Sequence, residues 1–152
     1  MRNLILIGTL LVAAGGAAVS PAAAQGLIND PTAIGQCLCE RQRLDALHQT
    51  MDQRRQSYES GQQNLASLDR DLEARRSSMN VTDQTQVDAY KQLLQRHDSA
   101  AATLSNSLIP DYNAAVARYN AARSSYDAGC AGKSFDQTAY DRVEASLSCP
   151  KP

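Results

Sequence analysis

Apolar side chains recur every seven residues through the first half of this chain, and this spacing constrains the fold more than any other feature. Leu47 and Leu68 fill intermediate positions of the repeat, whose main members are Leu44, Met51, Tyr58, Leu65, Leu72 and Met79. Such a repeat is typical of an α-helix that packs along a second helix. It predicts a long helix over 31–78, because Asp30 followed by Pro31 is a favourable helix start.

A second helix is expected over 84–129, after a turn at 79–83. Asp83, with Gln86 three residues later, is a capping signature for its start. Apolar and aromatic residues follow a 3-4 spacing and then continue after a one-residue shift: Val87, Tyr90, Leu94, His97, Ala101, Leu104 and Leu108, followed by Tyr112, Val116, Tyr119, Tyr126 and Cys130. The shift coincides with Pro110. Proline removes a helical hydrogen bond, so the sequence predicts a kink near 110.

Two such helices can bury their apolar stripes by folding back on one another around 79–82. This antiparallel register brings together three pairs of side chains: Leu72 with Leu94, Leu44 with Tyr119, and Cys37 with Cys130. It also predicts two ion pairs, Arg54 with Asp111 and Arg75 with Asp88. Arginine is tolerated beside an apolar stripe when its head reaches a carboxylate or, alternatively, when it extends to water.

Four cysteines lie near what would be the open end of this hairpin. Cys37 continues the heptad stripe, whereas Cys39 lies about 200° further round the same helix. The favoured pairing is Cys37 with Cys130 and Cys39 with Cys149, and the swapped pairing, Cys39 with Cys130 and Cys37 with Cys149, stays open. Redox or metal roles for these cysteines are the weaker alternatives to structural disulfides.

The two ends of the chain complete the predicted organisation. Residues 1–24 read as a signal peptide, with one positive charge, an apolar run and a small-residue cleavage site, so we expect a mature domain over 25–152. A short helix is predicted over 135–147, with Ser134 and Gln137 as its capping box. A signal peptide and paired cysteines together indicate a periplasmic or secreted protein with no integral membrane segment after cleavage.

Composition and motifs argue against several functional classes. The net charge is −1, and the arginines alternate with acidic residues along the helices, which is unlike the basic patch of a nucleic-acid-binding protein. His48 and His97 are predicted to lie about 30 Å apart along the hairpin. Serine is not combined with histidine and a carboxylate in a recognisable arrangement, nor is there a glycine-rich phosphate loop. We therefore expect no catalytic residues, cofactor or metal.

A ladder of tyrosines on the second helix, Tyr112, Tyr119 and Tyr126, has two interpretations. The favoured one is packing between the helices, since tyrosine can send its hydroxyl to the edge of an apolar stripe. The alternative is an interaction strip, because tyrosine is enriched at protein interfaces.

These observations predict an all-α fold: a long antiparallel, coiled-coil-like helical hairpin plus a short C-terminal helix, clamped by two disulfides. With one Phe and no Trp, the chain has little bulk for a globular core. The favoured hypothesis is a non-enzymatic structural or protein-interaction module of the cell envelope, with another envelope protein or a second copy of itself as partner. The alternative is a periplasmic chaperone or stress-binding module that holds unfolded clients.

Overall fold

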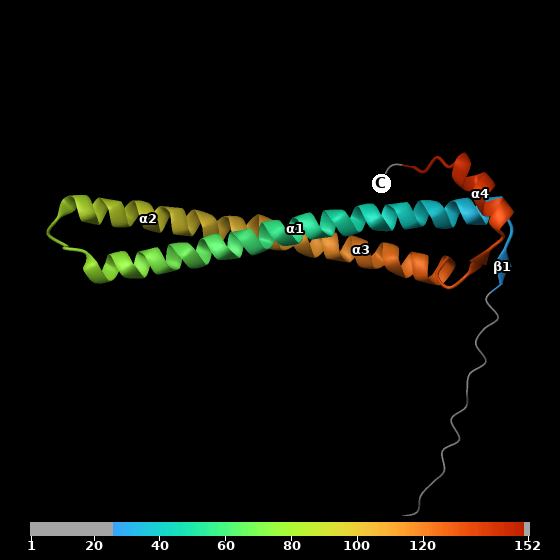
Figure 1. Ribbon diagram of the computed structural model, residues 1–152. Helices are drawn as coiled ribbons and strands as arrows, with labels where there is room; N and C mark the ends of the chain where they lie inside the picture. Colours follow the sequence, from blue (N-terminus) through green and yellow to red (C-terminus); the bar gives the residue numbers. More distant parts are fainter. Residues whose placement is uncertain (1–25, 151–152) are drawn as a thin grey trace, which may run out of the picture.

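A computed structural model describes residues 26–150 and shows a long helical hairpin with a small base at one end (Figure 1). The predicted signal peptide, 1–24, lies outside the described residues. One arm is a single helix, and the other is two helices joined by a π-helical segment: α1 (Pro31–Ser78), then α2 (Gln84–Thr103), η1 (Leu104–Leu108) and α3 (Ile109–Gly129). None of the helices in this described part is long and apolar enough to cross a membrane.

Both long helices begin at the predicted caps. The carboxylate of Asp30 accepts hydrogen bonds from the backbone N–H groups of Thr32 and Ala33, at 3.2 Å and 3.1 Å. Asp83 accepts from the backbone N–H groups of Thr85 and Gln86, at 3.0 Å and 3.3 Å. These bonds satisfy amide groups that have no partner inside the first turn of a helix.

The two arms run antiparallel in the predicted register. Cys37 at the start of α1 is bonded to Cys130 at the end of α3, and Arg54 Nη1 lies 3.6 Å from Asp111 Oδ2. The second predicted ion pair, Arg75 with Asp88, is wrong. Asp88 instead accepts from Lys91 Nζ at 3.3 Å and from Gln84 Nε2 at 2.9 Å. These partners lie about one turn away on its own helix and are reached without spanning the hairpin.

The phase of α2 differs by one residue from the predicted stripe. Leu93 is buried, with 5% of its surface exposed, whereas Leu94 is 41% exposed. The prediction that Leu94 packs opposite Leu72 is therefore wrong. Two consecutive leucines fit a helical stripe almost equally well, and which one faces the partner depends on how the helix continues past Leu108.

The π-helical segment η1 accounts for the one-residue shift in the stripe. Within it the backbone N–H of Ile109 donates to the carbonyl of Leu104, five residues back instead of four. This wider turn inserts one residue, so residues on both sides of it face α1, among them Leu93 before it and Ala115 after it, both buried. The chain then continues through Pro110 as α3.

Small elements close the base of the hairpin. A two-residue strand, β1 (Leu27–Ile28), pairs in parallel with β2 (Ser134–Phe135), and α4 (Gln137–Ala145) follows. The predicted cap at Ser134 is wrong, because Ser134 belongs to β2. Asp136 caps α4 by accepting from Ala139 N at 2.9 Å, while its own N–H donates to the Ile28 carbonyl at 2.9 Å.

Candidate functional site

Two disulfides cross-link the base, and they confirm the favoured pairing. Cys37 is bonded to Cys130 with a Cα–Cα distance of 5.5 Å, and Cys39 to Cys149 with 5.2 Å. Because the two cysteines of α1 lie about 200° apart around the helix, they form bonds to two different parts of the chain. The first bridge ties α1 to the end of α3, and the second ties α1 to the segment after α4.

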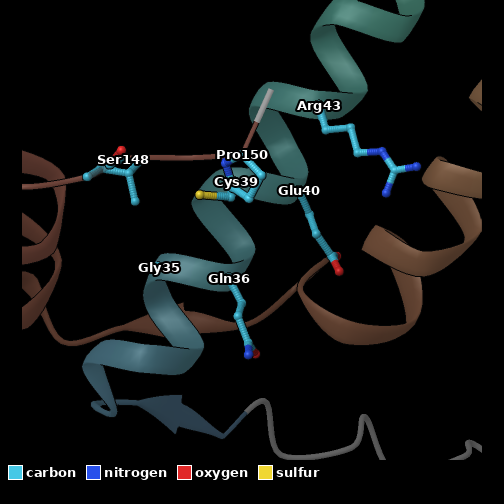
Figure 2. Close-up of a pocket in the computed structure, with 8 residues that line it drawn as sticks. Gly35, Gln36, Cys39, Glu40, Arg43, Ser148 and Pro150 are labelled. Atoms are coloured by element: carbon cyan, nitrogen blue, oxygen red, sulfur yellow. The ribbon is translucent and has the colours of Figure 1, made fainter. Parts of the chain in front are cut away.

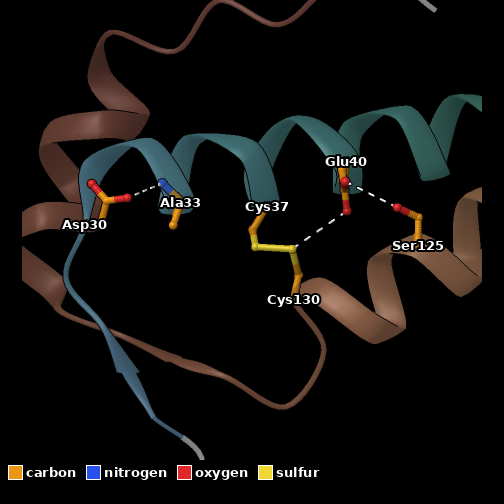
Figure 3. The surroundings of a disulfide bond; sticks show 6 residues. All are labelled: Asp30, Ala33, Cys37, Glu40, Ser125 and Cys130. Atoms are coloured by element: carbon orange, nitrogen blue, oxygen red, sulfur yellow. Dashed lines mark hydrogen bonds between the residues drawn. A yellow bond between two sulfur atoms is a disulfide. The ribbon is translucent and has the colours of Figure 1, made fainter.

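The Cys37–Cys130 bridge is buried between the arms (Figure 3). Its two cysteines are 6% and 5% exposed. Glu40, one turn along α1, places its Oε2 atom 3.8 Å from Cys130 Sγ, and its Oε1 atom accepts a hydrogen bond from Ser125 Oγ at 3.4 Å. A sulfur in a disulfide carries no proton, so the approach of Glu40 to Cys130 is a contact between a carboxylate and a sulfur atom and not a hydrogen bond.

The Cys39–Cys149 bridge lies on another face of α1, beside a cleft of about 570 Å³. Both of its cysteines are partly exposed. The cleft is formed by one face of α1 and the segment after α4, and its lining residues are Gly35, Gln36, Cys39, Glu40, Arg43, Leu147, Ser148 and Pro150. Figure 2 shows the side chains of Glu40 and Arg43 directed away from the sulfur of Cys39. The cleft therefore opens beside Cys39, with Glu40 and Arg43 among the residues that line it.

The histidines occupy separate levels of the hairpin. His97 Nε2 lies 2.9 Å from Asp69 Oδ1, across the hairpin, and Nδ1 lies 3.1 Å from Asp98 Oδ1. The hydrogen bond with Asp98, and then that with Asp69, raise the pKa of His97 above its ordinary value, against the opposing effect of desolvation. His48 instead lies 3.3 Å from Asp52 on its own helix. Both ring nitrogens of His97 are thus occupied by carboxylates.

The predicted tyrosine ladder faces α1. The ring of Tyr112 stacks on Tyr58 with centroids 5.6 Å apart, and Tyr119 lies 5.4 Å from the ring of His48. Tyr126 is also partly buried. These contacts favour the packing interpretation for Tyr112 and Tyr119, since a free interaction strip would leave both ring faces open to a partner.

The described residues, 26–150, contain no group of three or more His, Cys, Asp or Glu side chains that could hold a metal ion. No family model, curated protein or solved structure matches this chain. The candidate site is therefore defined by its geometry alone, as the pair of disulfides at the base together with the cleft beside Cys39.

Sequence reasoning missed two features of this region. The cleft beside Cys39 depends on where the segment after α4 lies, which the spacing of residues does not give. The contact between His97 and Asp69 was accessible, because the predicted register places these two residues opposite one another.

Proposed function

We propose that this protein is an exported, non-enzymatic helical hairpin that acts as a structural or protein-interaction module of the cell envelope. The observation that carries the proposal is the position of the cross-links. Both disulfides lie at the base, and the far end of α1 at Ser78 lies about 60 Å along the helix from Cys39. A rod fixed at one end and free at the other suits a spacer or an arm that reaches a partner.

Two disulfides also support a periplasmic or secreted location, because such bonds persist in oxidising compartments. The expected signal peptide over 1–24 agrees with this location. The partner in the proposal is another envelope protein or a second copy of the chain. Light scattering of the purified protein at tens of micromolar distinguishes the two, since a monomer mass contradicts the second copy.

The alternative, a chaperone for unfolded clients, requires a contiguous apolar surface. Within the described residues the most exposed large apolar side chains lie at separate levels of the molecule: Leu27 at the base, Val81 at the turn, and Leu94 and Ile109 along the second arm. Fifteen residues of helix, or about 22 Å, separate Leu94 from Ile109. Scattered single residues favour an interaction module over a client-binding groove.

An assay of aggregation suppression with several unrelated unfolded proteins tests this choice. We expect the oxidised protein to suppress none of them and to bind an apolar fluorescent dye weakly. In a pull-down from envelope extract we expect one reproducible partner, which is lost when Val81 at the free turn is replaced by Asp. Suppression of several clients by the oxidised protein contradicts the interaction module and supports the chaperone.

A further inference from the structure

The two disulfides of the base differ in how an attacking thiolate can reach them. Exchange requires a thiolate to approach one sulfur of the bridge, so access and local charge both control its rate. The loops that the bridges close are similar, with sequence separations of 93 and 110. Loop entropy therefore hardly distinguishes them, and any difference in reactivity comes from their surroundings.

The surroundings protect Cys37–Cys130. Both of its sulfur-bearing residues are buried between the arms, and the Glu40 carboxylate lies 3.8 Å from Cys130 Sγ. A carboxylate at this distance repels an incoming thiolate. It also disfavours the thiolate that would leave from Cys130, because a neighbouring negative charge raises a thiol pKa and makes it a poorer leaving group.

The surroundings expose Cys39–Cys149. Cys39 lines the cleft of about 570 Å³, which is large enough for a thiol side chain to enter (Figure 2). Residues 147–150 follow the end of α4 without regular secondary structure. Cys149 can therefore depart without breaking a helix or strand.

We propose that Cys39–Cys149 is a thiol–disulfide exchange site for dithiol reductants, whereas Cys37–Cys130 is the permanent clamp of the hairpin. One thiolate of the dithiol attacks Cys39 Sγ from the cleft. A mixed disulfide forms, the bond to Cys149 breaks, and Cys149 leaves as a thiolate that takes a proton from water. The second thiol of the reductant then forms its internal disulfide and releases Cys39, so that two electrons pass from the dithiol to the cysteine pair.

Reduction at this site changes the base locally and leaves the hairpin in place. α4 keeps other contacts, since its Val143 packs against Gly35 and its Tyr140 ring lies 6.1 Å from Phe135. The segment 147–150 loses its covalent attachment, and the cleft surface of α1 around Cys39 becomes open. The site thus presents two free thiols at the base while the rod stays folded.

The experiment is timed reduction of the oxidised protein with limiting dithiothreitol in native buffer, followed by acid quenching, alkylation and peptide mass spectrometry. We expect Cys39 and Cys149 to be alkylated at least about tenfold faster than Cys37 and Cys130. Helicity measured by circular dichroism should stay unchanged through the first phase. Equal rates, or earlier alkylation of Cys37 and Cys130, overturn the proposal.

Two controls separate the folded environment from the local sequence. In concentrated guanidinium chloride the two rates should converge, and a difference that persists there overturns the assignment to burial and cleft. Glu40→Gln should speed reduction of Cys37–Cys130 several-fold, and by more than it speeds that of Cys39–Cys149, because Glu40 lies 3.8 Å from Cys130 Sγ and is one of several residues that line the cleft beside Cys39. Glu73→Gln removes the same charge from an exposed, distant position on α1 and should change neither rate. An unchanged Cys37–Cys130 rate in Glu40→Gln overturns the shielding role of Glu40.

Discussion

The base of the hairpin and its distal half are stabilised by different interactions, although the same helix, α1, runs through both. At the base, Ile34 is fully buried, Leu38 is 8% exposed, and two disulfides join α1 to segments distant in sequence. In the distal half, Leu93 is the one large side chain among the described residues that is comparably buried. The base thus resembles a small cross-linked domain. The distal half, which we call the rod, depends on a narrow seam, the row of half-buried side chains between the two arms.

This difference shows how a chain with one Phe and no Trp can keep a long helical hairpin folded. A two-helix seam buries too little apolar surface at each level to be robust by itself. The disulfides at the base keep the two arms in register at that end. Further from the base, polar contacts between the arms, such as that of His97 with Asp69, determine which side chains face one another. Perturbing each region separately tests whether the base anchors the rod.

The largest effect should follow loss of a bridge at the base. When one disulfide is intact, the other closes a second, smaller loop. This loop runs through residues 37–39 and 130–149 and is completed by the two bridges. Removing either bridge should lower the free energy of unfolding by about 3 kcal/mol through chain entropy. For Cys37→Ala with Cys130→Ala we expect more than this, because buried packing is lost as well. Guanidinium chloride unfolding followed by circular dichroism measures the change.

Cys39→Ala with Cys149→Ala is the matched control for that experiment. It opens the same loop but removes side chains that are partly exposed, so its cost should be the entropic part alone. A larger loss of stability in this second variant would contradict the view that the buried bridge is the main anchor.

The next largest effect should come from overpacking the rod at Gly61, where α1 meets the π-helical segment. A Cβ atom built at Gly61 would lie 2.5 Å from Leu108 Cδ1 and 3.3 Å from Leu104 Cδ1. Gly61→Ala gains helix propensity of about 1 kcal/mol. Displacing these leucines from the seam should cost about 1–3 kcal/mol, so the net effect is expected to be destabilising or near zero.

Gly129→Ala makes the same substitution near the end of α3, where a Cβ atom meets nothing within 4 Å. We expect this variant to be stabilised by roughly 0.5–1 kcal/mol, and Gly61→Ala to be less stable than it in thermal unfolding. Adding Leu108→Ala should remove the penalty at position 61, measured as the coupling in a double-mutant cycle. Equal stability of the two glycine variants would show that the seam has room at this level.

Gly61 also illustrates what the sequence could and could not predict. The heptad repeat, the two aspartate caps and the placement of four cysteines were sufficient to predict the hairpin and its approximate register, and they favoured the observed disulfide pairing without excluding the swapped one. A seven-residue repeat specifies which face of α1 is buried, because it continues without interruption from Cys37 to Met79. On the second arm the repeat is interrupted, and there the prediction selected Leu94 in place of Leu93.

The error at Leu94 has a physical cause. A π-helical turn changes the phase of every residue on one side of it, and the sequence signals only that a shift occurs near Pro110, not where the extra residue lies. The short pairing of Leu27–Ile28 with Ser134–Phe135 depends on tertiary proximity and has no local pattern. The cleft beside Cys39 was equally inaccessible, because it forms between segments that the disulfide itself brings together.

The smallest effect should be a dependence of stability on pH through His97 in the rod. Its carboxylate partners, Asp69 across the hairpin and Asp98 on its own helix, raise its pKa in the folded state above the value in the unfolded chain. Protonated His97 therefore favours folding. This contribution is fully present below the ordinary histidine pKa of about 6.5 and is lost as the pH rises through the raised folded pKa.

Thermal unfolding between pH 5.5 and 8.5 measures this contribution against His97→Gln, which keeps a polar side chain but cannot become charged. We expect the melting temperature of the unmodified protein to fall relative to that of the variant as the pH rises, with a modest amplitude because both carboxylates are exposed to solvent. Asp69→Asn should reduce the amplitude, whereas Asp71→Asn, an exposed aspartate two residues further along α1, should not. If the difference were the same at every pH, His97 would contribute to the seam by packing alone, and the rod would lack the charged contact that distinguishes it from the base.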